Sequence, residues 1–315
     1  MLRPFRAEDA SEVHALHVRH AAADVVDIRS TLDPVLDADG VRRRMTEAEW
    51  AVVALDVAGS VVGWGALRSW TETDRTGVYL TDGYVAPQAR RQGLGTRLLR
   101  AAEIAAAEIA GAERAAGGGS GTGGTALVLG GNASTLQPHR GALLERNGYR
   151  HVFSMVEMEH DGPPAPPLRL PEGVTVRAAI LADGPALLAL AARAWAGRAY
   201  VVLPTEERLG DWLCRSELPL FQVATVGERM VGFVAASRTP LRAEIEDVQV
   251  DPAFQRRGLA TAMLTRTLAM LAELGAGPVR LHTEGHDPAG ARSLYARLGF
   301  RLVREYRRYR KPLRG

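Results

Sequence analysis

The order of apolar and polar residues repeats once along this chain. In each half, short apolar runs predict strands, and a longer stretch with apolar residues at helical spacing predicts a helix after them. A further strand, a helix and a Gly-aromatic pair then close each half, Gly148-Tyr149 in the first and Gly299-Phe300 in the second. A repeat on this scale predicts two copies of one α/β unit. The predicted strands are residues 51–57, 61–70, 125–129, 221–226, 230–236 and 278–283, and the predicted long helices are 94–109 and 259–274.

A basic, glycine-containing turn lies just before the long helix in both halves. Residues 85–95 read Val-Ala-Pro-Gln-Ala-Arg-Arg-Gln-Gly-Leu-Gly, and residues 250–260 read Val-Asp-Pro-Ala-Phe-Gln-Arg-Arg-Gly-Leu-Ala. The N-terminus of a helix presents unpaired N–H groups and a partial positive charge, and a glycine keeps side chains away from that backbone. The two turns therefore predict two seats for a pyrophosphate group.

The length of 315 residues suits two domains of ordinary size. The segment Asp-Gly-Pro-Pro-Ala-Pro-Pro at 161–167 cannot join a central strand. We therefore expect an N-terminal domain at 1–160, a proline-rich linker at 161–172 and a C-terminal domain at 173–315. The glycine run at 117–124 lacks the Gly-Lys-Ser/Thr ending of a nucleotide-binding loop, so we interpret it as a surface connection.

Composition narrows the class of protein. Hydrophobic residues make up 46% and charged residues 24% of the chain, and the mean hydropathy is −0.08, which is typical of globular proteins. A net charge of only +3 argues against a nucleic-acid partner. We see no signal peptide and no apolar segment long enough to span a membrane. The single cysteine, Cys214, excludes an intrachain disulfide and indicates a cytoplasmic protein.

Arginine is locally in excess near the C-terminus. Between residues 301 and 314 a set of five basic side chains faces the single Glu305; they are Arg304, Arg307, Arg308, Arg310 and Lys311. A charged strand at a sheet edge is one interpretation, because such charges suppress aggregation between sheets. Contact with an anionic ligand or partner is the other.

The turns, together with their surroundings, resemble one known family. Arg90-x-x-Gly93-x-Gly95 and Gln255-x-x-Gly258-x-Ala260, each after a strand and before a helix, are similar to the coenzyme A loop of the GCN5-related N-acetyltransferases. The second half adds Val-x-Val-x-Pro at 248–252 and Leu-Tyr-x-x-Leu-Gly-Phe at 294–300. The resemblance spans nearly the whole chain. It implies two tandem domains, each a mixed and mostly antiparallel sheet flanked by helices.

The resemblance also implies where the cosubstrate, acetyl-CoA or another acyl-CoA, would bind. In the family a backbone N–H of the strand before the loop holds the thioester carbonyl, and by position that residue is Val248. The other cofactor-binding residues implied in the second half are Val250, Gln255, Arg256, Arg257, Gly258, Leu259, Ala260 and Thr261. Those implied in the first half are Val85, Arg90, Arg91, Gln92, Gly93, Leu94, Gly95 and Thr96.

The catalytic residues are expected in the second half. An amine must lose a proton before it can attack, and the family carries such bases on the strand before the loop, where Glu244 and Glu246 stand. Their spacing of two puts both carboxylates on one face of a strand, although alternating glutamates can equally face solvent. Tyr295 matches the tyrosine that protonates the leaving thiolate, with packing in the core as the alternative.

Two departures from the family pattern stand out. Pro288 replaces an asparagine that many relatives carry seven residues before the tyrosine. In the first half Leu144 occupies the tyrosine position, and Tyr79 and Thr81 occupy the base positions. We therefore expect a catalytically degenerate first domain that either binds CoA or its acyl form or only buttresses the second domain.

The predicted function is thus transfer of an acetyl group to a primary amine of a small molecule by direct attack in a ternary complex. Acetylation of a protein lysine or N-terminus and a non-catalytic CoA-binding role are the alternatives. We expect no metal, since His282 and His286 lack a third ligand nearby in the sequence. A monomer or a homodimer is expected.

Overall fold

The computed structural model describes residues 1–315 except 22, 28–29, 116–125, 240–241, 287–289 and 314–315. The glycine run at 117–124 and Pro288, both singled out above, lie outside the described residues. The chain divides into two compact units. Unit 1 comprises Met1–Ser154 and Tyr306–Gly315, and unit 2 comprises Met155–Glu305.

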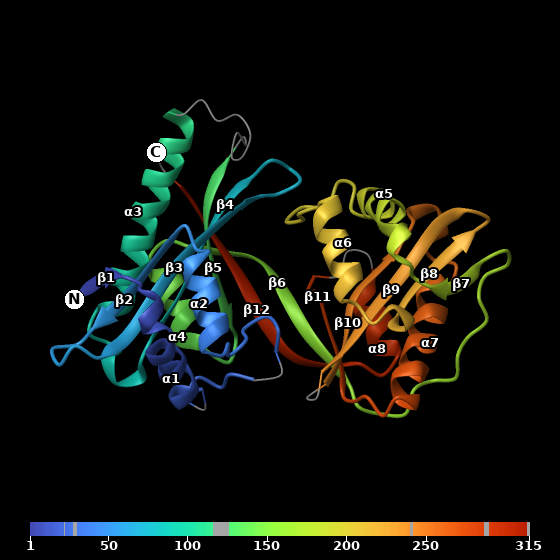
Figure 1. Ribbon diagram of the computed structural model, residues 1–315, viewed down its shortest axis with the longest axis horizontal. Coiled ribbons are helices and arrows are strands. Elements are labelled where there is room, and N and C mark those ends of the chain that lie inside the picture. Colours follow the sequence, from blue (N-terminus) through green and yellow to red (C-terminus); the bar gives the residue numbers. More distant parts are fainter. Residues whose placement is uncertain (22, 28–29, 116–125, 240–241, 287–289, 314–315) are drawn as a thin grey trace. The chain divides into compact units, whose positions relative to one another are not determined.

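Unit 1 is built on a mixed sheet (Figure 1). Its strand order is β1-β2-β3-β4-β5-β12, and all neighbours are antiparallel except β4 and β5, which are parallel. The strands are β1 (Leu2–Pro4), β2 (Trp50–Leu55), β3 (Val61–Thr71), β4 (Gly77–Val85), β5 (Leu127–Ser134) and the end of β12 (Arg301–Pro312).

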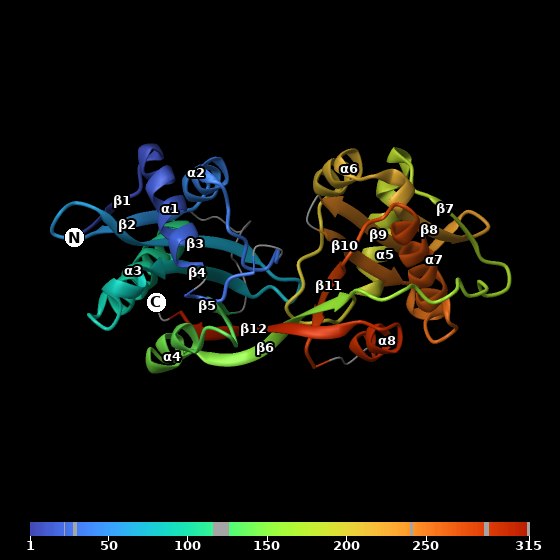
Figure 2. The same cartoon turned by 90° about the horizontal axis from the view of Figure 1, so that it is seen from below.

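Helices cover both faces of this sheet (Figure 2). Helices α1 (Ala10–His20) and α2 (Ala38–Thr46) pack on one face, and α3 (Leu94–Ala115) and α4 (Pro138–Arg146) pack on the other. Strand β4 faces both layers because its side chains alternate. Tyr84 joins the core beneath α1 and α2, whereas Tyr79 joins the core beneath α3.

Unit 2 repeats the arrangement with strand order β6-β11-β10-β9-β8-β7. Only β10 and β11 are parallel; the other neighbours are antiparallel. The strands are β6 (Arg150–His160), β7 (Thr175–Ala178), β8 (Phe221–Val226), β9 (Arg229–Thr239), β10 (Arg242–Val250) and β11 (Val279–Glu284).

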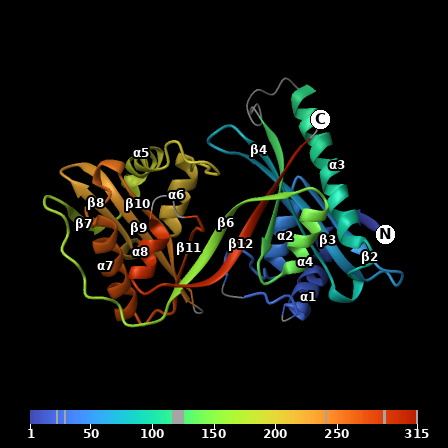
Figure 3. The same ribbon diagram turned by 180° about the vertical axis from the view of Figure 1, so that it is seen from behind.

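The helices of unit 2 also form two layers. Helices α5 (Gly184–Ala194) and α6 (Glu206–Arg215) pack over Phe221 and Phe233. Helices α7 (Leu259–Glu273) and α8 (Ala291–Arg297) share the opposite core, in which Met263 is fully buried (Figure 3). Each unit therefore has one core on either side of its sheet.

The closing strand of each sheet comes from the other half of the sequence. The end of β12, from Tyr306 to Pro312, pairs with β5 in unit 1, while the end of β6, from Met155 to His160, pairs with β11 in unit 2. Tyr309 of β12 is 2% exposed and belongs to the core beneath α3. The sequence division at 1–160, 161–172 and 173–315 does not contain this exchange of strands and stays a prediction.

Within the described residues no helix is both long enough and apolar enough to cross a membrane.

Replacing Tyr309 with Ala tests the exchange of strands. Loss of a large buried ring costs about 3 kcal/mol, so backbone amides of β5 should exchange with deuterium about 100-fold faster while those of β11 keep their protection. Arg307→Ala, at an exposed position of the same strand, removes no buried ring and is the control, which should leave the protection of both strands nearly unchanged. Equal loss of protection in β5 and β11 would contradict the assignment of β12 to unit 1.

Candidate active site

The two glycine turns have the same backbone. Arg91 and Gly93 have φ values of 63° and 78°, and Arg256 and Gly258 have 61° and 82°. A Cβ atom on either glycine would meet nothing within 4 Å, so the left-handed backbone and not packing requires glycine. Helices α3 and α7 begin at the next residue, which directs the first N–H groups of each helix toward its turn.

The first side chain of each motif fastens the turn to the preceding strand. Nε of Arg90 donates to the carbonyl of Val85 over 2.9 Å, and Nε2 of Gln255 donates to the carbonyl of Val250 over 3.1 Å. Arg90 also forms an ion pair with Asp24 over 2.6 Å. These two side chains thus share a structural role, which is to fix each turn against its strand.

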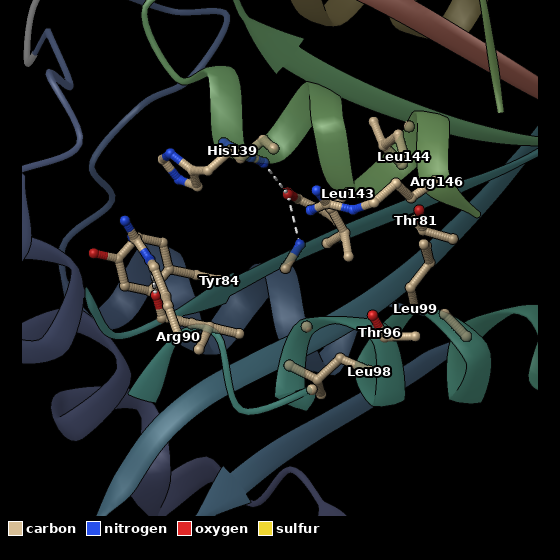
Figure 4. Close-up of a pocket in the computed structure, with 18 of the residues that line it drawn as sticks. Thr81, Tyr84, Arg90, Thr96, Leu98, Leu99, His139, Leu143, Leu144 and Arg146 are labelled. Carbon is tan, nitrogen blue, oxygen red and sulfur yellow. Dashed lines mark hydrogen bonds and ion pairs between the residues drawn. The ribbon is translucent and has the colours of Figure 1, made fainter. Parts of the chain in front are cut away.

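A cavity of about 380 Å³ lies beside the turn of unit 1. Strands β4 and β5 are paired only as far as Thr81 and Gly131, and both continue beyond that point. The cavity occupies the space where they separate, between α3 and α4 (Figure 4). Among the residues implied for cofactor binding, those that line it are Val85, Arg90, Arg91, Gly93, Gly95 and Thr96. Its volume falls in the range of small-molecule sites.

One end of this cavity is polar. In Figure 4 Tyr84 and Arg90 lie together, with His139 of α4 across from them, and the Arg90 guanidinium carbon is 5.5 Å from the centre of the Tyr84 ring. Burial and the Asp24 carboxylate raise the pKa of Tyr84. Burial lowers the pKa of His139, so its imidazole is neutral at pH 7.

The predicted catalytic strand of unit 2 also separates from its parallel neighbour. Strand β10 pairs with β11 only from Ala243 to Ile245 and then continues to Val250. Its pairing with β9 is interrupted at Glu246, because Ile245 and Asp247 oppose consecutive residues of β9. Such a bulge redirects side chains at the point where the strand leaves its neighbour.

Glu246 projects toward α6. Nε1 of Trp212 donates a hydrogen bond to Oε2 of Glu246 over 2.6 Å, and the glutamate itself is exposed. Trp212 also packs against Phe221, with ring centres 4.8 Å apart. The indole therefore holds this carboxylate in one position while solvent reaches it.

Glu244 belongs to a buried network of charged groups. Nη2 of Arg242 lies 2.5 Å from Oε2 of Glu244, and Nδ1 of His282 lies 3.3 Å from Oε1. The other ring nitrogen of His282 is 3.5 Å from Oε1 of Glu157, which is fully buried. Burial lowers the pKa of His282, but the two carboxylates outweigh it and raise the pKa. His282 thus connects the predicted base to a second carboxylate inside the protein.

Asp247 was not predicted and is a third carboxylate at the separation. Burial raises its pKa to about 6, although Nε2 of Gln249 donates to it over 2.7 Å. A carboxylate with that pKa accepts a proton near neutral pH more readily than an ordinary aspartate does. Strict alternation along β10 would place Asp247 on the opposite face from Glu246, so only the bulge reveals that both belong to one site.

Tyr295 is 7% exposed and packs edge-on against Phe300, with ring centres 5.9 Å apart. The equivalent residue of the first repeat, Leu144, lines the cavity of unit 1. By the repeat, the position of Tyr295 in α8 corresponds to a residue that lines the cavity of unit 1, while Tyr295 itself belongs to the core beneath α7 and α8. A role for Tyr295 in protonating a thiolate stays a prediction, as do the roles of Glu244 and Glu246.

The chain belongs to the acetyltransferase (GNAT) family, whose sequence profile matches residues 23–118 and 187–300. It is 30% identical over 305 residues to a mycothiol acetyltransferase of Geodermatophilus obscurus, covering 88% of this chain and 91% of that protein. A GCN5-related N-acetyltransferase from Sphaerobacter thermophilus has a similar structure, with a TM-score of 0.78 at 22% identity over 100% of this chain and 96% of that one. A tandem GNAT protein from the clavulanic acid biosynthesis pathway gives 0.69 at 15% identity, over 100% and 99%.

The predicted α/β fold with two tandem units is thereby confirmed, and the protein is an N-acetyltransferase. Membership of the family implies use of acetyl-CoA. The residues present fit this cosubstrate, because the cavity between β4 and β5 opens beside a left-handed turn and a helix N-terminus. Which of the implied residues contact it stays a prediction.

The pKa of Asp247 predicts how stability depends on pH. Because the folded-state pKa lies near 6 and an unfolded aspartate titrates near 3.9, the folded state binds more protons between these values. Asp247 therefore stabilises the fold less as the pH rises from 4 to 7. Asp247→Asn removes this contribution, so the free energy of unfolding of the variant minus that of the native protein should increase across this range, as measured by urea unfolding. An identical pH dependence in both proteins would contradict the assignment.

Proposed function

We propose that this protein transfers the acetyl group of acetyl-CoA to a primary amine of a small molecule, by direct attack in a ternary complex at unit 2. The observation that carries the proposal is the separation of β10 from β11, which gathers three carboxylates at one place: Glu244, Glu246 and Asp247. The relatives named mycothiol acetyltransferase support a small-molecule acceptor, since their name gives one.

The cosubstrate, when bound, presents an acetyl thioester to the amine. The turn from Gln255 to Thr261 and the start of α7 would receive its pyrophosphate through main-chain N–H groups. The N–H of Val248, on the edge of β10 that faces the gap, would donate to the thioester carbonyl. Unit 1 offers the same backbone at Gly93 and a cavity beside it, so we propose that it binds an acyl-CoA as well.

The carboxylates of unit 2 would take up the proton of the incoming amine. An alkylammonium titrates near pH 10.4, so its deprotonation at pH 7 costs about 4 to 5 kcal/mol, part of which a positioned base offsets. Glu246 is accessible to an incoming amine, and Asp247 has a pKa suited to neutral pH. Glu244 would pass a proton on through His282, which it contacts.

Completion of the reaction requires a proton for the departing thiolate. As the amine nitrogen forms its bond to the carbonyl carbon, the carbon–sulfur bond breaks and its electrons remain on sulfur. The phenol of Tyr295 would supply the proton, which the amine then replaces by way of the carboxylates.

Acetyl transfer to a panel of primary amines tests the assignment of residues. The candidate bases are removed one at a time, by Glu244→Gln, Glu246→Gln or Asp247→Asn. The variant that lacks the base should have a kcat lower by about 10² to 10⁴. Tyr295→Phe should lower kcat with little change in KM for the amine, since the phenol acts after binding. Glu228→Gln, in the exposed β8–β9 turn, is the control. Unchanged rates in all four variants would overturn the proposal.

Titration of CoA by calorimetry tests the two turns separately. Gly93→Glu and Gly258→Glu place both a strained backbone and a negative charge where the pyrophosphate would lie, so each should abolish binding at its own unit. Gly59→Glu and Gly227→Glu are matched controls, because both glycines have positive φ and open space in exposed turns. Loss of all binding with Gly258→Glu alone would exclude a working site in unit 1.

A further inference from the structure

A row of polar side chains crosses the sheet of unit 1 where β4 and β5 separate. In β12, Arg308 is the register partner of Asn132 in β5. Asp82 continues the row on β4, one residue past Thr81, the last residue that pairs with β5. Tyr306, two residues before Arg308, contacts Ser30 in the segment between α1 and α2 over 2.7 Å. Because strand side chains alternate, Arg308 faces the same side as Tyr306, which is the α1–α2 side.

Positive charge exceeds negative charge around this row. Nη2 of Arg44 lies 2.5 Å from Asp82, and Arg140 lies 3.4 Å from Asp82 and 3.5 Å from Asp33. Among the described residues Arg68 and Arg308 form no ion pair, although both feel the charge of Asp82. Four guanidinium groups therefore face two carboxylates.

Arg308 is the more buried of the two arginines that form no ion pair among the described residues. It is half-buried, and burial lowers its pKa to about 10, with Arg310 adding to the effect. Its neighbour Arg310 has a partner, Glu72, at 2.5 Å. A desolvated guanidinium without a counter-ion is costly, and an anion placed beside it would recover that free energy. The side-chain amide of Asn132 stands next to it as a further donor.

A second, smaller cavity of about 30 Å³ lies on the same side of the sheet. It is lined by His17 of α1, by Asp33 and by Arg44 of α2. It shares four wall residues with the large cavity, namely Asp82, Gly83, Tyr84 and Arg140. The same segment of β4 therefore lines both the acyl-CoA cavity and this charged cavity. An acyl donor and its acceptor are expected to occupy adjoining cavities of this kind.

We infer that unit 1 holds an acceptor subsite of its own, which takes a small amine carrying an anionic group, a carboxylate or a phosphate, bound by Arg308 and Arg68. The inference rests on the proposed function in that an acyl-CoA occupies the cavity of unit 1. It assigns the arginine-rich C-terminal strand to ligand binding. Arg44 and Arg140 hold Asp82 and Asp33 in place, and Arg308 and Arg68 remain for the ligand.

Calorimetry on the full chain with CoA at saturation tests this subsite, because CoA then fills the glycine turns. Three probes differ in their anionic group: phosphoethanolamine, β-alanine, and ethanolamine, which has none. We expect phosphoethanolamine or β-alanine to bind at least tenfold more tightly than ethanolamine, and the better of the two identifies phosphate or carboxylate as the preferred group.

Arginine variants locate the binding. Arg308→Gln and Arg68→Gln should each weaken the anionic probe at least tenfold, whereas Arg307→Gln, on the other face of β12, should leave it unchanged. Arg68 is exposed, so its variant keeps the fold even where Arg308→Gln is found by thermal unfolding to be destabilised. Equal affinity for all three probes, or affinity that neither variant changes, would overturn the inference.

The CoA titration distinguishes this failure from failure of the proposed function. If CoA still binds but the probes show no preference for an anionic group, only the acceptor subsite is ruled out. If CoA does not bind, the proposed function falls, and the probes titrated without CoA still decide whether Arg308 and Arg68 bind an anion.

Discussion

Both sites depend on parallel strand pairing that stops partway. In unit 1 the ladder between β4 and β5 ends at Thr81, and in unit 2 the ladder between β10 and β11 ends at Ile245, although the strands continue. Beyond these points the backbone groups on the facing edges no longer bond to each other and become available to a ligand. The glycine turn follows the end of the same strand, with Gly93 eight residues after Val85 and Gly258 eight residues after Val250, so the same divergence positions the helix N-terminus beside the opening.

Different residues surround the strand separation in unit 1 and the strand separation in unit 2. In unit 1 the opening is a formed cavity with apolar walls from α3 and α4 and a polar end at Tyr84 and His139. In unit 2 the opening is bordered by carboxylates, one held by Trp212, one joined to His282 and one with a raised pKa. Unit 1 therefore has a formed cavity at its strand separation, whereas unit 2 has a cluster of carboxylates at the corresponding place.

Exchange of the closing strands ties the two halves of the sequence to each other's sheets. The end of β12 supplies Tyr309 to the core of unit 1, and it also supplies Arg308 to the face on which the acceptor subsite is inferred. Neither feature can form from the first half of the sequence alone. The basic residues near the C-terminus thus reach this face because β12 pairs with β5, which lies some 175 residues earlier in the chain.

Local chemistry determined much of this protein in advance. Apolar periodicity predicts the repeat and the positions of the main strands and helices. Residues adjacent in sequence predict the two glycine turns and the placement of Glu244 and Glu246 on one strand. Neither signal depends on a partner strand. Tertiary structure alone decided the rest. The bulge that adds Asp247 to the site depends on the register with β9, the contact between His282 and Glu244 depends on parallel pairing, and the position of Arg308 depends on strand exchange. Each of these is a relation between segments far apart in the chain, and one residue of register changes which face a side chain occupies.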